Sequence, residues 1–250
     1  MATSPRILIP VPTSFDEAYN LQCWPEYASA INATGGEPVR VPLTHSAAEL
    51  EALVANADGI LLPGSPADVD PALYGHARHD TTAQADPWRQ QTDRVLLETA
   101  ERTKLPLLGI CMGLQTMNTF YGGTLIQDLD PLPVNHSAGR AVQAAHTIVL
   151  AATSRLFRIA SSTAECAVES DGDGRIPVNS SHHQSIDVSG ESLRITARCR
   201  QDGVVEAIEG SDPAQWIVGV QWHPERTLES SAVSAALFRA FIDAAAQHHA

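Results

Sequence analysis

The sequence of 250 residues contains only four cysteines, and no two of them form a C-x-x-C pair. They are Cys23, Cys111, Cys166 and Cys199. In a chain of this length without a recognisable secretion signal, such wide spacing argues against a framework of disulfides. We therefore expect a protein of the reducing cytoplasm, in which Cys111 remains a free thiol.

Basic residues are also scarce, with 16 Lys and Arg against 29 Asp and Glu, and the net charge is −13. Such an acidic chain is a poor match for nucleic acid or an anionic membrane surface, so we expect neither as a partner. Long hydrophobic runs are absent. Pro10 and Pro12 interrupt the first apolar segment, which argues against a signal peptide and a membrane span. No internal repeat or Pro- and Ser-rich linker divides the chain.

What the chain does contain is a pattern of apolar runs and turn residues that predicts an α/β fold. In the first half, strands predicted at 6–10, 37–41, 58–62 and 105–110 alternate with helices at 25–34, 47–55, 88–103 and 113–121. In the second half, strands at 144–150, 164–169, 193–197, 204–208 and 216–220 precede a closing helix at 231–248. We expect a single domain over residues 1–250, with a mixed, mainly parallel central sheet flanked by helices.

Residues 109–115, Gly-Ile-Cys-Met-Gly-Leu-Gln, place Cys111 at the tip of a predicted strand-to-helix turn. Hydrolases present a nucleophilic serine on such a turn with the pattern G-x-S-x-G, and here sulfur takes the place of oxygen. The N-terminus of the following helix would stabilise a thiolate. A buried cysteine that acts as a small hydrophobic residue is the commoner role of a lone cysteine. We favour the nucleophile because a candidate base follows later in the chain.

The candidate base is His223, in the stretch Gly-Val-Gln-Trp-His-Pro-Glu at residues 219–225. Pro224 fixes the backbone between His223 and Glu225, so the two side chains can lie close together at the end of a strand. A carboxylate beside an imidazole selects its tautomer and stabilises its charged form, which is the third role in a catalytic triad. If these residues have no catalytic function, the stretch is instead a strand end with a proline turn and a solvated carboxylate.

Gly64 lies in Pro-Gly-Ser-Pro, directly after the third predicted strand. It is either a plain turn glycine or, with Met112, the source of two backbone N–H groups that form an oxyanion hole. One such donor is typically worth about 3 to 4 kcal/mol of transition-state stabilisation. Ligands of open α/β sheets bind beyond the carboxyl ends of the strands. Gly64, Cys111 and His223 each follow a predicted strand end, so we expect them to converge on one crevice.

The stretch Asn-Ser-Ser-His-His-Gln at residues 179–184 places two histidines next to each other. Neighbouring residues of an extended segment point to opposite faces and seldom bind the same ion. No cysteine or carboxylate stands nearby at the spacing of metal ligands. We therefore expect no metal here, and we interpret the stretch as a polar loop that faces the substrate.

Taken in their order along the chain, the four motifs around Gly64, Cys111, residues 179–184 and His223 resemble those of class I glutamine amidotransferase-like proteins. Within that group the chain is most similar to the γ-glutamyl-γ-aminobutyrate hydrolase branch, peptidase family C26. Further matches are Gly122-Gly123-Thr124-Leu125 and Asp202-Gly203 leading into Val205-Glu206-Ala207, so the resemblance covers nearly the whole chain. The resemblance implies a mixed central sheet with helices on both sides, and it requires no cofactor or metal.

The resemblance also implies a role for each candidate site residue. It assigns the nucleophile, the base and the orienting acid to Cys111, His223 and Glu225, and the oxyanion donors to the amides of Gly64 and Met112. It places Gln115, Ser181 and His182 at the substrate. Many members of this branch carry an arginine directly after the nucleophile, where this chain has Met112. That difference leaves the identity of the leaving amine open.

Together the motifs and the resemblance predict hydrolysis of a γ-glutamyl amide, such as γ-glutamyl-γ-aminobutyrate, through a γ-glutamyl thioester. The expected partner is therefore a small-molecule γ-glutamyl substrate. Two alternatives are a glutaminase subunit that supplies ammonia to a separate synthetase, and a catalytically silent binding protein on the same fold. Retention of Cys111, His223 and Glu225 argues against the silent protein. The oligomeric state stays open, with a homodimer as one alternative.

Overall fold

The computed structural model describes residues 4–129 and 131–248. The expected domain over 1–250 also includes residues 1–3, 130 and 249–250, which lie outside the described residues. The helices are α1 (Glu17–Ala33), α2 (Ala47–Val54), α3 (Pro87–Thr103), α4 (Met112–Phe120), α5 (Arg155–Ala160) and α6 (Ala232–His248), with 3-10 turns η1 (Pro71–Tyr74) and η2 (Pro224–Thr227). The strands are β1 (Arg6–Pro10), β2 (Glu37–Val41), β3 (Gly59–Leu62), β4 (Leu107–Ile110), β5 (Leu125–Ile126), β6 (His146–Leu150), β7 (Ala167–Val168), β8 (Gly174–Val178), β9 (Ser185–Ile186), β10 (Leu193–Cys199), β11 (Val205–Gly210) and β12 (Ile217–Val220).

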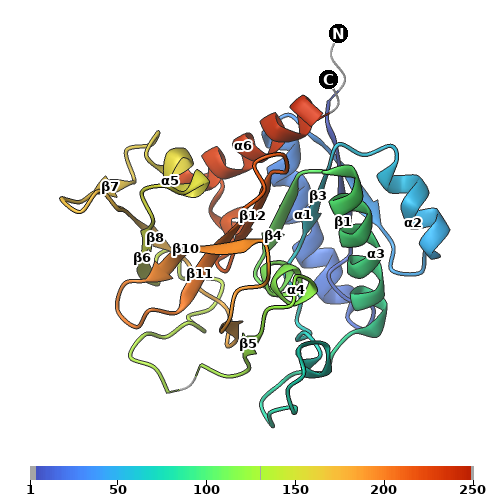
Figure 1. The fold of residues 1–250 in the computed structure, drawn as a ribbon, viewed down its shortest axis with the longest axis horizontal. Coiled ribbons are helices and arrows are strands. Elements are labelled where there is room, and N and C mark those ends of the chain that lie inside the picture. Colours follow the sequence, from blue (N-terminus) through green and yellow to red (C-terminus); the bar gives the residue numbers. More distant parts are fainter. Residues whose placement is uncertain (1–3, 130, 249–250) are drawn as a thin grey trace.

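Within the described residues, one mixed sheet has the strand order β2-β1-β3-β4-β12-β11-β10-β6-β8-β7 (Figure 1). The strands from β2 to β12 in this order are parallel to their neighbours. From β12 onward, every neighbouring pair is antiparallel. The predicted mixed α/β fold is therefore confirmed, and the parallel half contains the strand ends at which Gly64, Cys111 and His223 were expected.

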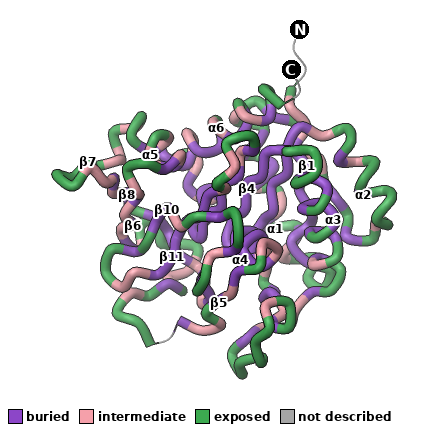
Figure 2. Tube along the Cα trace, in the orientation of Figure 1, coloured by how far each residue is buried: buried purple, intermediate pink, exposed green. Residues whose placement is uncertain are grey.

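Helices cover both faces of this sheet because successive strand residues point to opposite sides. In β1, Ile7 and Ile9 share a core with buried residues of α1, α5 and α6. Leu8 between them belongs to a second core with α2, α3 and α4. The most buried stretches accordingly follow the central strands (Figure 2). The fold is a three-layer arrangement of helices, sheet and helices.

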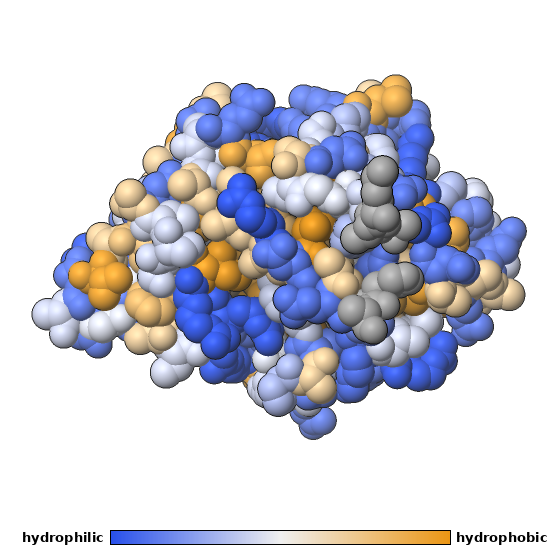
Figure 3. Space-filling view, turned by 90° about the horizontal axis from the view of Figure 1, so that it is seen from above, coloured by the Kyte–Doolittle hydropathy of each residue, from blue (hydrophilic) through white to orange (hydrophobic). Residues whose placement is uncertain are grey.

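The surface seen from above carries small groups of hydrophobic side chains between hydrophilic ones (Figure 3). Exposed large hydrophobic residues include Leu21, Leu73 and Trp88, which lie on different elements. None of the helices in the described part of the chain has both the length and the apolar character required to cross a membrane.

The largest error in the predicted elements concerns the first helix, which was expected to start at Pro25. The structure begins α1 at Glu17, because the carboxylate of Asp16 accepts a hydrogen bond from the amide of Tyr19 and caps the helix. Pro25 lies inside α1. The sequence pattern also missed α5, the short strands β5 and β9, and β8, which contains Pro177, a residue type depleted in strands.

Candidate active site

Cys111 occupies the turn between β4 and α4, and the predicted order of strand, turn and helix is confirmed. Its backbone has φ 53° and ψ −110°, in the positive-φ half of the Ramachandran map that residues with a side chain rarely adopt. The Cys111 amide donates a hydrogen bond of 2.8 Å to the carbonyl of Val220 at the end of β12. A strained residue that neighbouring structure holds in place is a common feature of functional sites.

Two glycines allow this turn to form. A side chain on Gly113 would overlap the carbonyl oxygen of Leu62 in β3, and one on Gly109 would overlap the sulfur of Met117 in α4. The glycines of the G-x-C-x-G pattern are therefore required by the close approach of α4 to the sheet. This packing brings the start of α4 directly over the ends of β3 and β4.

His223 follows β12, the parallel neighbour of β4, so it emerges at the same edge of the sheet as Cys111. A methyl group on Gly64 would lie 3.0 Å from Cε1 of His223 and 3.5 Å from Cβ of Cys111. The expected convergence of Gly64, Cys111 and His223 is therefore seen in the structure. Nδ1 of His223 is 2.7 Å from Oε1 of Glu225, and both side chains are buried.

The charge state of His223 depends on these neighbours. Burial on its own lowers the pKa of an imidazole, but the charges of Glu225 and Cys111 and hydrogen bonds to both raise the pKa of His223 to about 9. Burial likewise raises the pKa of Glu225, whereas the charge and hydrogen bond of His223 and the charge of Arg226 bring it below its ordinary value. The geometry thus favours an imidazolium that is held between a carboxylate and a sulfur atom.

Two residues that the sequence reasoning gave no individual role hold this pair in place. The side-chain amide of Asn179 donates to the carbonyl of His223 and accepts from its N–H, both at 2.8 Å. Nε of Arg226 lies 3.5 Å from Oε1 of Glu225, and its Nη1 donates a 2.9 Å hydrogen bond to Oγ of Ser181. Ser181 is therefore connected to the site through Arg226. The only sequence signal for Arg226 was its position directly after Glu225.

The amide of Gly64, expected as an oxyanion donor, donates a 3.1 Å hydrogen bond to the hydroxyl of Tyr27 in α1. Burial and the nearby charge of Glu225 raise the pKa of Tyr27 well above its ordinary value, so this hydroxyl stays neutral. The amide of Met112 is one of the first in α4 and has no intrahelical acceptor. Sequence reasoning missed Tyr27, because nothing in the local pattern of α1 indicates where its hydroxyl lies.

Buried Arg89 in α3 holds the backbone on the other side of Gly64. Its Nη2 donates to the carbonyl of Pro63 at 2.8 Å and its Nη1 to that of Pro12 at 2.9 Å. Its Nε is paired with Asp93 one turn later. The carbonyl of Pro63 and the N–H of Gly64 belong to one planar peptide unit and point in opposite directions. Arg89 therefore fixes the direction of the Gly64 N–H.

The two remaining predicted substrate residues are buried in other contacts. The side-chain amide of Gln115 donates to the carbonyl of Gln184 and to Oε1 of Gln221, each at 3.2 Å. Nδ1 of His182 is 2.9 Å from the Gln184 carbonyl, and its Nε2 is 3.6 Å from Oε1 of Glu206. Their roles at the substrate stay predictions.

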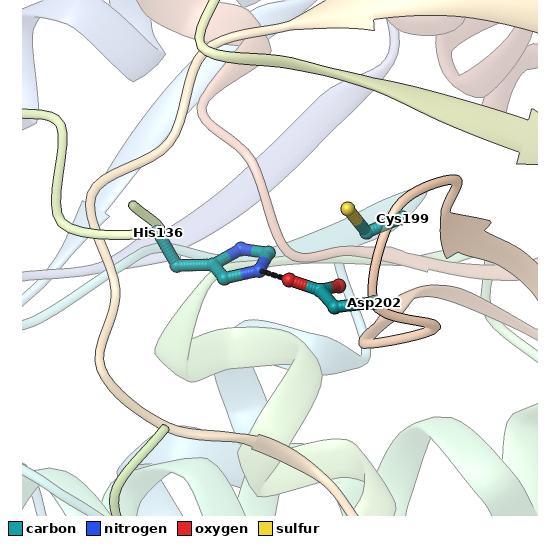
Figure 4. Close-up of side chains that lie close together, drawn as sticks. All are labelled: His136, Cys199 and Asp202. Atoms are coloured by element: carbon teal, nitrogen blue, oxygen red, sulfur yellow. Dashed lines mark hydrogen bonds and ion pairs between the residues drawn. The ribbon is translucent and has the colours of Figure 1, made fainter. Parts of the chain in front are cut away.

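Two overlapping groups of side chains have the donor atoms and the proximity to hold a metal ion. One comprises His136, Cys199 and Asp202 (Figure 4), and the other comprises His136, His146 and Glu206. Most members of these groups come from separate segments of the chain, although Cys199 and Asp202 lie three residues apart. The absence of metal-ligand spacing in the sequence therefore did not exclude them.

Comparison with known proteins gives consistent matches. The family model of peptidase C26 matches residues 12–225. Over 241 residues the chain is 35% identical to the γ-glutamyl-γ-aminobutyrate hydrolase PuuD of Escherichia coli, covering 90% of this chain and 86% of that protein. It is 29% identical to the protein NtpR of Enterococcus hirae, covering 86% of each. The glutaminase domain of Trypanosoma brucei CTPS, solved with bound acivicin, superimposes with a TM-score of 0.60 at 14% identity, over 98% of this chain and 94% of that one.

Proposed function

Since the chain belongs to the peptidase C26 family and is a glutamine amidotransferase-like hydrolase, we propose that it cleaves a γ-glutamyl amide with Cys111 as its nucleophile. The observation that carries this proposal is the strained, positive-φ backbone of Cys111 beside the buried pair of His223 and Glu225. Such an elbow exposes a sulfur atom next to a group that can accept and return its proton.

In the first half of the reaction, the Cys111 thiolate attacks the γ-carbonyl carbon, and a carbon–sulfur bond forms. The carbonyl electron pair moves onto oxygen and then returns as the carbon–nitrogen bond breaks. The His223 imidazolium gives its proton to the departing amine nitrogen. A γ-glutamyl thioester and a neutral imidazole remain. General acid catalysis of this kind contributes roughly 10² to 10⁴ in rate.

In the second half, neutral His223 takes a proton from water, and the resulting hydroxide attacks the thioester carbonyl. The carbon–sulfur bond breaks, which releases glutamate and restores the thiolate and imidazolium pair. Glu225 keeps its hydrogen bond to Nδ1 of His223 and stabilises the charged ring in both halves. Asn179 holds the backbone of His223 against the movement of the ring.

The developing oxyanion would lie between the amides of Gly64 and Met112. Because the Gly64 N–H donates to the hydroxyl of Tyr27, the substrate oxygen must replace the tyrosine oxygen as its acceptor. The neutral hydroxyl of Tyr27 can then donate its own proton toward the same oxygen. As substrate binds, Tyr27 would thus change from the acceptor of the Gly64 N–H into a third hydrogen-bond donor to the substrate oxygen.

The proposed substrate is γ-glutamyl-γ-aminobutyrate, supported by 35% identity to an enzyme named for that reaction. Met112 provides no cation beside the nucleophile, so recognition of the amine portion must rest on other residues of this chain. Arg226 is the nearby cation that contacts Glu225 and Ser181. We place the protein in the reducing cytoplasm, where the thiols of its four free cysteines persist.

The test is glutamate release from γ-glutamyl-γ-aminobutyrate, measured beside other γ-glutamyl amines, γ-glutamyl peptides and free glutamine. Cys111→Ala should abolish release, whereas Cys166→Ala, which removes a thiol outside the site, should leave it unchanged. Intact mass should show a γ-glutamyl adduct in the wild type and in Cys166→Ala. Equal rates in the wild type and Cys111→Ala would exclude the mechanism.

The same assay separates the alternatives. Cleavage of free glutamine only together with a second, co-purifying protein would indicate an ammonia-supplying subunit. Failure to form any adduct with all of the γ-glutamyl substrates would indicate a silent binding protein.

A further inference from the structure

A second cluster of buried polar side chains lies around Glu206 in β11, and it plays no part in the proposed reaction. Oε1 of Glu206 is 2.9 Å from Nε2 of His146, 3.4 Å from Nδ1 of His136 and 3.6 Å from Nε2 of His182. These four side chains expose at most 2% of their surface. Three imidazoles therefore meet at one carboxylate oxygen inside the protein.

The outer nitrogens of two of these rings determine their tautomers. Nε2 of His136 faces the carboxylate of Asp202 at 3.0 Å, and Nδ1 of His182 faces the carbonyl of Gln184 at 2.9 Å. Both partners only accept hydrogen bonds, so these nitrogens carry the protons. In the neutral rings, the lone pairs of the other nitrogens then point at the Glu206 carboxylate. Lone pairs and a carboxylate repel one another unless a positive centre joins them.

Most of the unpaired atoms of the cluster lie on the Glu206 side. Nδ1 of His146 is the exception, because Nε2 on the other edge of this ring forms the 2.9 Å hydrogen bond with Oε1 of Glu206. Nδ1 of His136, Nδ1 of His146, Nε2 of His182 and Oε2 of Glu206 are buried without a hydrogen-bond partner among the described residues. Buried polar atoms without partners are rare in folded proteins, and four in one cluster require an explanation. A bound cation would account for those that face Glu206.

The atoms on the opposite edge of His136 are already paired. Figure 4 shows the ring with one nitrogen directed at Asp202. Asp202 also accepts from the amide of Val204, and the Cys199 thiol donates to Oε1 of Gln201. The group of His136, Cys199 and Asp202 therefore lacks free donor atoms. Nδ1 of His136, Nε2 of His182 and Oε2 of Glu206 are unpaired, so the Glu206 side is the better candidate for an ion, with Asp202 as an outer partner of His136. The ion would replace the hydrogen bond between His146 and Glu206.

The distances fit a transition-metal ion. Tetrahedral zinc with bonds of about 2.0 to 2.1 Å to nitrogen and oxygen holds its donor atoms roughly 3.3 Å apart. The separations of 2.9 and 3.4 Å from Glu206 to His146 and His136 lie on either side of that value. A small movement of the His182 ring would add a fourth donor. Carboxylate and carbonyl partners on the outer nitrogens are typical of metal-bound histidines.

An entry path also exists. A hollow of about 470 Å³ is lined by residues of the loop at 128–137 together with His182 and His183. His136 and His182 are among its lining residues, so the hollow lies against the cluster. A deeply buried donor set without such access would fill only during folding.

We propose that His136, His146 and Glu206, with His182 beside them, form a binding site for one transition-metal dication of the zinc type. The ion would tie the loop before β6 to β6 itself and to β11, the neighbour of β12, which ends just before His223. It would be separate from Cys111, so its role is to stabilise this side of the sheet. The proposal does not depend on the substrate or on the catalytic mechanism.

The test is direct metal binding by the full chain. Protein stripped with a strong chelator is titrated with Co²⁺ at neutral pH while its visible absorption is recorded, and bound Zn²⁺ is counted by mass spectrometry after dialysis. One saturable ion per chain is expected in the wild type and in Cys111→Ser, which removes the catalytic thiol as a ligand. Zn²⁺ should displace Co²⁺ and raise the thermal unfolding midpoint.

Glu206→Gln keeps the shape of the side chain and should weaken binding at least a hundredfold. His45→Asn, which changes a histidine on another part of the chain, serves as the matched control and should bind like the wild type. If Glu206→Gln does not fold, the titration of the wild type still shows whether the protein has a saturable metal site. A wild type without a saturable site overturns the proposal, and so does equal affinity in Glu206→Gln. If protons alone hold the cluster together, the wild type will show no saturable metal site.

Discussion

At the scale of single residues, the site depends on backbone positions that a side chain would disturb. Cys111 is held in a conformation with positive φ, and Gly113 two residues later packs on the carbonyl of Leu62. The pattern G-x-C-x-G could be read from the sequence because each of its members acts locally. What the pattern could not give is the atom against which each glycine packs.

Gly113→Ala should destabilise the protein by about 3 kcal/mol or more, because the new methyl group overlaps the backbone of β3. Gly203→Ala is the matched control: Gly203 has φ +78° but open space around it, so only the conformational penalty of about 1 kcal/mol applies. Urea denaturation of both variants measures the difference. Equal losses would mean that the contact with Leu62 is not restrictive.

His223 gives a pH dependence with a definite sign. Its pKa of about 9 in the folded protein lies above the ordinary 6.5, so the stabilisation that it provides is complete below pH 6.5. This stabilisation is lost as the pH rises through 9. Acylation uses the same proton, so we expect kcat/KM for glutamate release to fall above about pH 9.

Glu225→Gln should move this alkaline limb toward neutral pH, because the charge that raises the pKa of His223 is removed. Glu229→Gln removes an exposed carboxylate from the same segment and should leave the profile in place. The full pH profile of each variant decides the matter. An alkaline limb at the same pH in Glu225→Gln would contradict the assigned cause.

At the scale of elements, helix α3 contributes to the site without any residue in the four sequence motifs. Its Arg89 is buried, paired with Asp93, and bonded to the carbonyl of the peptide unit that ends in the Gly64 amide. The local sequence of α3 does not explain why a charged residue lies on the buried side of this helix. The loop at 179–184 is similar: the sequence indicated a role near the pocket, and the structure shows Asn179 fixing the backbone of His223.

Arg89→Lys should lower kcat about tenfold to a hundredfold with little change in KM, because one ammonium cannot hold both carbonyls and the Gly64 amide turns from the oxyanion. Arg94→Lys alters an exposed arginine of the same helix and should have no effect. Steady-state kinetics of both variants, with unfolding midpoints, make the comparison. A loss confined to stability, with kcat intact, would show that Arg89 is only structural.

At the scale of the whole molecule, two hydrophobic cores share one sheet. Alternate residues of the same strands enter opposite cores, so neither core can unfold while the other stays ordered. We therefore predict that the chain unfolds as one unit, as expected for a single domain. Far-ultraviolet circular dichroism reports on all elements, whereas Trp24, Trp216 and Trp222 report mainly on one core. The two signals should give the same transition, and separate midpoints would contradict a single unit.

The cluster around Glu206 shows what sequence reasoning about metals could not reach. The sequence presents His182 and His183 only as a local pair, and the expectation that this pair binds no metal stays a prediction. The structure instead combines His182 with His136, His146 and Glu206 from other segments. Ligand spacing along the chain carries no information when each ligand comes from a different element.

The sequence by itself determined most of the elements, and it determined the strand ends at which the candidate catalytic residues lie. Apolar periodicity, caps such as Ser46, and glycine turns act over a few residues, so they could be read directly. Only the tertiary structure decided that Tyr27 contacts the Gly64 amide across 37 positions, or that His146 meets Glu206 across 60. Such contacts depend on the order of strands in the sheet and on the packing of helices across it. No local pattern records that information.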